Sequence, residues 1–296
     1  MARHSSPDSL TGFVNLNKPT DMTSSDAVCI VRGVLSRRIG GRQKTGHLGT
    51  LDPLARGVLP IALGKATALF ELLAFKRKHY TARFTFGKTT DTLDAGGAFL
   101  NEKGRVPDAE EVQEVLARFI GDIEQIPPAY SAKSVGGRRA YSYARSGETV
   151  ELAPKTVSVY SLSLTQAEGD TFTFDIECGG GTYIRSLARD IADALGTCAY
   201  MSALTRTRSG AFRIEDAVTV EQFKASPETY VLPVETALEG MQTVFLTSDE
   251  ARRILNGVPV ETSLNEGERA IVKDPSGSLL GIGTASARGT RLTIRL

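Results

Sequence analysis

Residues 46–60 read GHLGTLDPLARGVLP and place one carboxylate, that of Asp52, among three glycines and two prolines. Glycine permits unusual backbone torsions and proline fixes them, so this composition is typical of a shaped loop. Pro53 disfavours helical torsions at the residue before it, and the Asp52 carboxylate should therefore project from an extended backbone. An aspartate in this position could equally cap a following helix. The loop alone leaves both interpretations open.

The composition indicates a globular protein without a membrane span. The chain has 296 residues, of which 41% are hydrophobic, enough for one large domain and a small one. It contains no run of about 18 apolar residues, and its start lacks the apolar segment of a secretory signal, so we expect it in the cytoplasm. Three widely spaced cysteines and three histidines argue against a disulfide framework and a zinc site. We expect no metal.

Basic residues are unevenly distributed, although the net charge is only +1. Residues 27–51 contain five basic side chains and residues 125–147 contain four, and neither stretch has an acidic one. Separated charge of this kind can present one basic face to a polyanion such as RNA, although solvated loops would give the same pattern. The side chains that we expect to contact phosphates are Lys18, Arg37, Arg38, Arg42, Lys44 and the basic residues of 133–145.

A mixture of helical and strand patterns predicts an α+β fold. Residues 81–86 and 171–178 alternate polar and apolar side chains, as half-buried strands do. After the glycines at 179–181, apolar residues recur at helical spacing, and Gly196 stands where a helix commonly ends. Residues 109–120 carry an apolar stripe opposite a row of acids, which predicts a surface helix.

The pattern changes near Val244. Ser248 can cap a short helix that ends at Gly257, and strand-like runs follow at 270–272, 279–282 and 292–296. We therefore predict a large domain over residues 1–243 and a small β-rich domain over residues 244–296.

The loop at 46–60 resembles the signature loop of the bacterial TruB-type tRNA pseudouridine synthases. Six further segments match that family in the same order: residues 16–19 (LNKP), 78–80 (KHY), 91–97 (DTLDAGG), 126–133 (IPPAYSAK), 181–187 (GTYIRSL) and 204–210 (LTRTRSG). The resemblance implies a catalytic domain built on a mixed, mainly antiparallel sheet flanked by helices, followed by a small PUA-like RNA-binding domain. One departure is Thr205, which stands where many relatives have arginine and puts one phosphate contact in doubt.

The resemblance also implies the reaction. The N1–C1′ bond of a uridine, expected to be uridine 55 in the T arm of tRNA, is cleaved, the uracil rotates, and a C5–C1′ bond forms without a cofactor. The family's catalytic aspartate corresponds to Asp52. An aspartate of ordinary pKa is ionised at neutral pH, as this role requires. Whether the carboxylate attacks the sugar, attacks the base or removes a 2′ proton stays open.

Further roles follow from the same resemblance. Arg185 pairs with the catalytic carboxylate and offsets its desolvation, and Tyr80 stacks on the detached ring and takes part in proton transfer. Leu204 packs against the base, and His47 fills the space that the flipped base leaves. From the residues alone, Tyr80 and Leu204 could be ordinary core. The predicted catalytic set is Asp52, Tyr80 and Arg185, and the predicted substrate-binding set is His47, Tyr183, Leu204, Lys18 and Arg206.

Competing interpretations are few. A phosphate-binding NTPase is excluded because the Gly-Lys pairs at 64–65 and 87–88 lack the earlier glycine of a P-loop. Asp91 and Asp94 precede two glycines and predict a turn rather than a metal site or a hydrolase pair. An RNA-binding protein without turnover and a synthase within a guide-RNA complex are the alternative functions. We favour a stand-alone, monomeric enzyme whose partner is tRNA.

Overall fold

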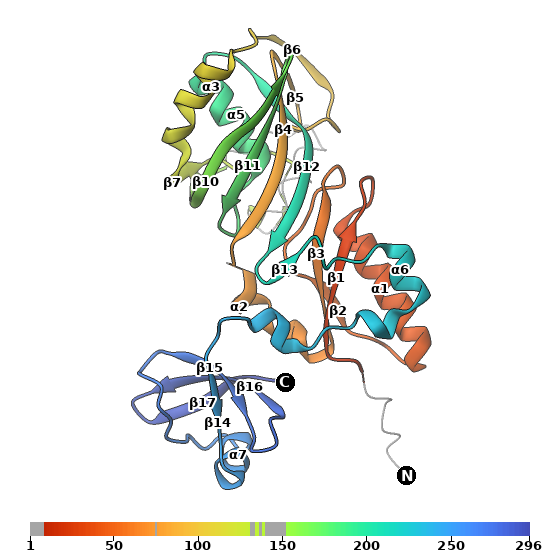
Figure 1. The fold of residues 1–296 in the computed structure, drawn as a ribbon, viewed down its shortest axis with the longest axis vertical. Coiled ribbons are helices and arrows are strands. Elements are labelled where there is room, and N and C mark those ends of the chain that lie inside the picture. The colour runs from red at the N-terminus through yellow and green to blue at the C-terminus, as the bar shows by residue number, and fades with distance from the viewer. Residues whose placement is uncertain (1–8, 75, 131–133, 136–137, 140–151) are drawn as a thin grey trace.

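The structure, a computed structural model, describes residues 9–74, 76–130, 134–135, 138–139 and 152–296. Most of the basic run at 133–145 therefore lies outside the described residues. Figure 1 shows two parts, a large sheet with helices packed along it and a smaller sheet formed by the C-terminal residues. Among the helices of the described residues, none combines the length and the apolar character needed to cross a bilayer.

The large sheet has nine strands, and its main path runs β1-β3-β12-β4-β11-β10-β7, with β2 paired to β3 and β13 paired to β12. Its pairings are antiparallel except that of β3 with β12, which confirms the mixed, mainly antiparallel sheet of the predicted fold class. Two small hairpins, β5–β6 and β8–β9, stand apart from it. The strands are β1 (Gly12–Lys18), β2 (Thr45–His47), β3 (Arg56–Leu63), β4 (Lys78–Phe86), β5 (Lys88–Thr90), β6 (Phe99–Lys103), β7 (Gly121–Gln125), β8 (Ser134–Val135), β9 (Arg138–Arg139), β10 (Lys155–Glu168), β11 (Thr171–Cys178), β12 (Ala199–Ser209) and β13 (Phe212–Arg213).

Four helices pack against this sheet and share one apolar core with it: α1 (Ser24–Ile39), α3 (Ala109–Leu116), α5 (Ile184–Ala194) and α6 (Val220–Ala225). Helix α1 begins at a capping box in which Thr23 and Asp26 bind each other's backbone N–H groups, and it ends at Gly40 with a φ of 63°. The predicted helix at 109–120 is α3 followed by the 3-10 turn η2 (Ala117–Phe119). Shorter helical segments are η1 (Gly64–Leu69), α2 (Phe70–Ala74), η3 (Pro227–Tyr230) and η4 (Val234–Leu238).

The two strands predicted from alternation are β4 and β11, and they pair side by side. Tyr80, Phe84 and Phe86 of β4 point into the core, where the rings of Phe84 and Phe174 lie 4.7 Å apart between centroids. Helix α5 also lies where predicted, and Gly196 follows it with a φ of 66°. The alternating pattern therefore placed the central strands correctly.

A separate sheet with the order β14-β15-β16-β17 contains the C-terminal strands, and helix α7 accompanies it. The cap of α7 differs from the prediction: Thr247, rather than Ser248, is the N-cap, because its hydroxyl accepts a hydrogen bond from the Glu250 N–H while the Glu250 carboxylate accepts one from the Thr247 N–H. The elements are β14 (Thr243–Phe245), α7 (Ser248–Leu255), β15 (Arg269–Lys273), β16 (Leu279–Ser286) and β17 (Gly289–Arg295).

The small sheet has its own apolar cluster, which includes Ile254 and Val272. A second cluster, which includes Phe13 of β1 and Ile282 of β16, joins it to the large sheet. The separate sheet agrees with the predicted fold class. The boundary at residue 244 stays a prediction.

Along the main path of the large sheet, the pairing of β3 with β12 is the shortest. Two residue pairs connect these strands in parallel, Arg56 with Thr205 and Gly57 with Arg206. A Cβ at Gly57 would lie 2.3 Å from the Arg206 carbonyl oxygen, and the φ of Gly57 is +104°, so this close approach requires glycine. The loop that carries Asp52 links β2 to β3 and therefore lies beside this junction.

Candidate active site

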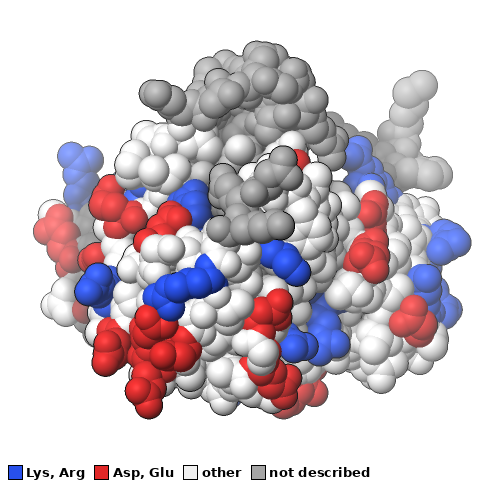
Figure 2. Space-filling model, turned by 90° about the horizontal axis from the view of Figure 1, so that it is seen from above, with Lys and Arg blue, Asp and Glu red and all other residues white. Residues whose placement is uncertain are grey.

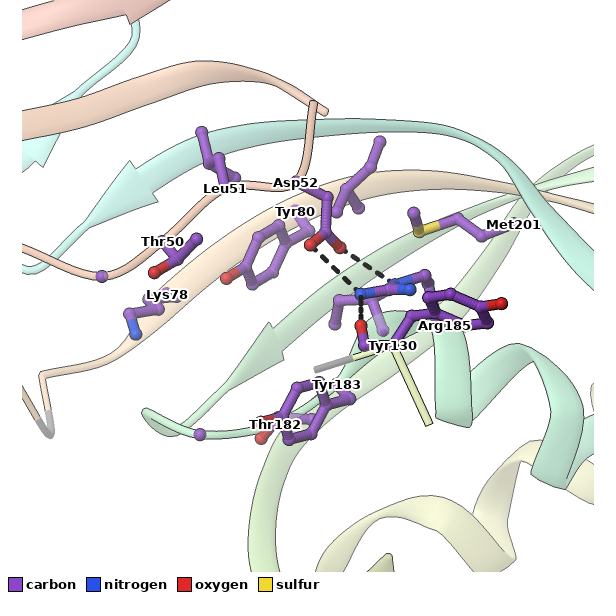
Figure 3. Close-up of a pocket in the computed structure, with 14 residues that line it drawn as sticks. Thr50, Leu51, Asp52, Lys78, Tyr80, Tyr130, Thr182, Tyr183, Arg185 and Met201 are labelled. Carbon is purple, nitrogen blue, oxygen red and sulfur yellow. Dashed lines mark hydrogen bonds and ion pairs between the residues drawn. The ribbon is translucent and has the colours of Figure 1, made fainter. Parts of the chain in front are cut away.

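A cavity of about 290 Å³ opens beside the junction of β3 and β12. Its volume lies near the lower end of the range for small-molecule pockets. Asp52 reaches it from the β2–β3 loop, Tyr80 from β4, Leu204 from β12, and Tyr183 and Arg185 from the start of α5 (Figure 3). The structure thus brings five of the eight predicted site residues to one cavity.

The carboxylate of Asp52 and the guanidinium of Arg185 form a two-point ion pair in the cavity wall, as the dashed lines of Figure 3 show. Arg185 Nε lies 2.9 Å from Asp52 Oδ2, and Arg185 Nη2 donates to Asp52 Oδ1 at 3.1 Å. The Arg185 side chain is 6% exposed, whereas that of Asp52 is 34% exposed. Burial raises the pKa of the Asp52 carboxyl, and the Arg185 guanidinium opposes that rise. The pair fixes the carboxylate and still leaves part of it accessible to a ligand.

Arg185 is held by further acceptors. Its Nη1 donates to the Thr92 carbonyl at 2.9 Å and lies 3.4 Å from Asp94 Oδ2, and its Nη2 donates to the Tyr130 carbonyl at 3.1 Å. The turn predicted at Asp94 is confirmed, since the Asp94 carboxylate accepts a hydrogen bond from the Gly96 N–H. The contact between Asp94 and Arg185 was not predicted, because the local spacing of the acids carries no information about a partner so far along the chain.

The backbone on both sides of Asp52 is anchored. The Ser24 hydroxyl donates to the Leu51 carbonyl and accepts from the Leu51 N–H, each at 2.9 Å. The Pro53 carbonyl accepts from the Asp21 N–H at 2.9 Å. Because both neighbours of Asp52 are tied to the start of α1 and the turn before it, the carboxylate is positioned before any substrate binds.

Lys18 corrects the sequence analysis. Its side chain is fully buried, and its ammonium donates to the carbonyls of Pro19 at 2.9 Å, Met22 at 2.7 Å and Pro53 at 3.3 Å. Burial lowers its pKa to about 8. A phosphate cannot reach this ammonium, so the predicted phosphate contact is wrong. Lys18 instead helps to fix the loop at Pro53.

Arg206 is likewise fully buried, which corrects its place in the substrate-binding set. Its guanidinium donates to the carbonyls of Val58 at 2.7 Å, Gly49 at 3.1 Å and Thr50 at 3.4 Å. These contacts hold the backbone of the loop in place, although Arg206 does not itself line the cavity. Arg206 is therefore a positioning residue.

Tyr80, Leu204 and Met201 supply an aromatic and apolar wall. They belong to the main core and also line the cavity, so the two interpretations left open by the sequence both apply. Burial raises the pKa of the Tyr80 hydroxyl, and the nearby Arg206 guanidinium opposes that rise. A flat wall of this kind suits the face of a nucleobase.

His47 lies at the end of β2 and does not line this cavity. Its Nδ1 is buried and has no hydrogen-bond partner among the residues that the structure describes. Burial lowers the pKa of His47, with a smaller effect from Arg206. The imidazole is therefore neutral at physiological pH. Its role at a flipped base stays a prediction.

The surface charges of the described residues give limited guidance. Arg37, Arg38, Arg42 and Lys44 are exposed, as phosphate contacts require, and those contacts stay a prediction. On the face drawn in Figure 2, the described basic side chains are interspersed with acidic ones, and a group of acidic side chains lies at its lower left. Among the described residues, no group of three or more His, Cys, Asp and Glu side chains is arranged to hold a metal ion.

Comparisons with known proteins identify the family of the chain. The model of the TruB family pseudouridylate synthase N-terminal domain matches residues 37–184, and that of the tRNA pseudouridylate synthase B C-terminal domain matches residues 185–239. The tRNA pseudouridine synthase B of Caulobacter sp. (strain K31) is 43% identical over 263 residues, which cover 87% of this chain and 83% of that protein. The chain belongs to the TruB family. It is therefore a pseudouridine synthase, an isomerase.

Other relatives extend the match to nearly the whole chain. The tRNA pseudouridine synthase B of Caldanaerobacter subterraneus subsp. tengcongensis is 42% identical over 96% of this chain and 98% of its own. Among solved structures, a Cbf5-Nop10-Gar1 complex contains a chain with a TM-score of 0.70 and 28% identity, matched over 93% of this chain and 78% of that one. The boundary between the two TruB family models falls between Ile184 and Arg185, so the ion pair with Asp52 joins both matched regions.

Proposed function

We propose that this TruB family enzyme isomerises uridine 55 in the T arm of tRNA, with Asp52 as its essential carboxylate. The similar proteins from Caulobacter and Caldanaerobacter are named tRNA pseudouridine synthase B, which supports tRNA as the substrate. The resemblance of the loop at 46–60 and of the six other segments supports position 55. The geometry around Asp52 supports the assignment of the chemistry.

The single observation that carries the chemistry is the two-point pair between Asp52 and Arg185. A carboxylate that acts as a nucleophile or a base must be ionised, and a desolvated carboxylate stays ionised when a cation lies beside it. Arg185 provides that cation from a position fixed by Asp94 and two backbone carbonyls. The exposed third of Asp52 faces the cavity in which the nucleotide would lie.

The isomerisation conserves all atoms. The N1–C1′ bond breaks, the C5–C1′ bond forms, C5 loses a proton and N1 ends with one, so no oxidant, reductant or external group is needed. Asp52 would start this sequence by adding to C1′, by adding to the base or by removing the 2′ proton. Each route begins from the anion, which is the form that Arg185 favours.

Tyr80 would stack on the uracil and relay the proton that leaves C5. Its ring forms part of the cavity wall (Figure 3). Because burial raises the pKa of its hydroxyl, Tyr80 is a neutral phenol at physiological pH and would pass a proton on rather than act as a permanent phenolate.

Extrusion of the uridine costs a few kcal/mol of stacking. His47 would offset part of this cost by filling the space that the base leaves in the stack, and Leu204 by packing against the flipped base.

The test uses the isolated chain, without guide RNA or partner protein, and a tRNA transcript labelled with tritium at uracil C5. We expect catalytic release of tritium, because the C5 hydrogen is lost in the product, and pseudouridine at position 55 when the RNA is mapped by carbodiimide treatment and primer extension. A transcript with cytidine at position 55 is the matched control and should release none. Undiminished release from that control would refute the assigned position, and absence of release from the parent transcript would favour the non-catalytic or the guide-dependent alternative.

A further inference from the structure

Lys78, the first residue of β4, lines the same cavity as Asp52 but is not part of its ion pair. In Figure 3 the Tyr80 ring lies between the Asp52–Arg185 pair at one end and the Lys78 side chain at the other. Lys78 is half-buried, and among the described residues no carboxylate lies within ion-pair distance of its amine. The cavity therefore has a compensated charge at one end and an uncompensated cation at the other.

The surroundings of Lys78 make this cation unusual. The positive charge of Arg206 acts on Lys78, and the Arg206 guanidinium is already bound to three backbone carbonyls. Burial, followed by the charge of Arg206, lowers the Lys78 pKa to about 8. A desolvated ammonium without a counterion is costly for the folded protein, so such a group is commonly retained for a ligand that supplies the opposite charge.

The loop before Asp52 is shaped to accommodate the amine. A Cβ at Gly49 would lie 3.2 Å from Lys78 Nζ, and Gly49 has a φ of +87°, a conformation that favours glycine. The amine therefore lies against the backbone of the loop that presents Asp52. A ligand that spans the cavity would contact both the carboxylate and this ammonium.

We propose that Lys78 is a phosphate subsite, in which its ammonium binds the phosphate adjoining the flipped uridine while the Asp52 end receives the ribose and the base. This inference rests on the proposed function. A nucleotide unit of RNA has one anionic group, its phosphate, and a neutral base. Arg185 is already occupied by two carboxylates, and Lys18 and Arg206 are fully buried and do not line the cavity, so Lys78 is the cation of the cavity wall left to meet that phosphate among the described residues. Lysine contacts phosphate as a compact point charge.

The first test measures RNA binding as a function of salt concentration. Lys78→Met and Lys78→Arg are made in an Asp52→Asn background, so that the T-arm hairpin is bound without turnover. Loss of one phosphate contact lowers the slope of log K against log salt by about 0.7 to 0.9. We expect this change for the methionine variant and a preserved slope for the arginine variant.

Lys65→Met, at an exposed lysine outside the cavity, is the matched control and should leave the slope unchanged. An unchanged slope for Lys78→Met would overturn the proposal.

The second test uses pH. A bound phosphate favours the charged amine, so the affinity of the Lys78 protein should fall as the pH rises above about 8, where the free amine loses its proton. The titratable and charged groups around it are Arg206 on β12, Cys178 on β11, and Asp52 and Tyr80 in the cavity, while Lys18 titrates in the same range. Lys78→Arg changes the Lys78 contribution alone and should flatten this fall. An equal fall in both proteins would contradict the proposal.

The third test identifies the phosphate. T-arm hairpins that carry one neutral methylphosphonate linkage each are compared for binding to the protein with Lys78 intact and to the Lys78→Met variant. We expect one linkage, next to the target uridine, at which Lys78→Met no longer weakens binding. If the effect of Lys78→Met persists at every linkage, the ligand of Lys78 is not a phosphate. Pseudouridine formation by the parent enzyme is measured separately, so failure of this subsite and failure of the proposed function give different results.

Discussion

The two faces of the central sheet carry similar chemical groups in different settings. His79 and Tyr80 are neighbours on β4 and point to opposite faces. On the outer face, His79 Nε2 lies 2.8 Å from Asp175 Oδ1 and His79 Nδ1 lies 3.0 Å from Thr207 Oγ1. On the inner face, Tyr80 adjoins the Asp52–Arg185 pair. Each face thus brings together a carboxylate, a nitrogen-containing group (an imidazole or a guanidinium) and a hydroxyl group.

Burial and anchoring separate the two groups. His79 and Asp175 are 35% and 39% exposed, and Asp52 is similarly exposed at 34%, but its partner Arg185 is only 6% exposed. The outer group extends from strands β4, β11 and β12 and does not line the Asp52 cavity. The Asp52 loop, in contrast, is tied by Ser24, Lys18 and Arg206 beside that cavity. The comparison indicates that similar groups form a functional site where an anchored loop holds them beside a cavity that can receive a ligand.

The largest effect should come from Arg185→Met. It removes the cation from two carboxylates, and an uncompensated buried charge costs about 3 to 5 kcal/mol, so both folding stability and turnover should suffer. We expect the single-turnover rate to fall by about 10³-fold, in line with the loss of a preorganised electrostatic contact. Arg185→Lys keeps the charge without the two-point geometry and should fall between the methionine variant and the parent. If Arg185→Met kept the parental single-turnover rate, the Asp52–Arg185 pair would be no more important for turnover than the His79–Asp175 pair.

Arg206→Met should have the next largest effect, because it frees the loop that carries Asp52 and also removes a cation from beside the Tyr80 hydroxyl. Three backbone carbonyls lose their donor, and misplacement of a catalytic group by about 1 Å can cost about 10²-fold in rate. Tritium release under saturating RNA measures the rate. A variant that folds normally and keeps the parental rate would show that anchoring does not distinguish the two faces.

The pH dependence of turnover offers a graded test. Burial raises the pKa of Asp52, and the anion is the reactive form, so activity should be lost as the pH falls through a value above the ordinary range for aspartate. Below that value the single-turnover rate should drop about tenfold per pH unit. Circular dichroism at each pH controls for unfolding. An acid limb at or below the ordinary value would contradict the desolvation of Asp52.

The smallest effect should follow from His79→Asn on the outer face. A half-exposed pair contributes about 0 to 1 kcal/mol, so the free energy of unfolding should change little and the turnover rate should stay within about twofold of the parent. Urea unfolding and tritium release measure the two quantities. A large loss of turnover would mean that the outer group takes part in the reaction, and the contrast between the faces would fail.

The sequence predicted the elements whose signals are local. Alternation located β4 and β11, and the glycines around α5 located that helix and, through the resemblance, Arg185. These predictions of elements succeeded because side-chain periodicity and turn chemistry are decided by neighbouring residues. Asp52 was singled out by the resemblance of its loop, and its catalytic role stays a prediction.

The sequence did not predict which cations are buried. Lys18 and Arg206 looked like surface groups, yet both are enclosed because β1 and β12 run beneath the Asp52 loop. For Arg206 a signal existed, since it shares a face of its strand with buried Leu204. The contacts of Asp94 with Arg185 and of Lys78 with the cavity depend on how segments far apart in the sequence pack together, which no local pattern records.

The most direct test of the whole account is the single-turnover rate of Asp52→Asn with saturating tRNA, measured together with its affinity. The substitution removes the anion, keeps the size of the side chain and leaves Arg185 paired with Asp94. We predict loss of pseudouridine formation with tRNA binding close to that of the parent. Conversion of uridine by this variant at the parental rate would contradict the assignment of Asp52 as the essential carboxylate.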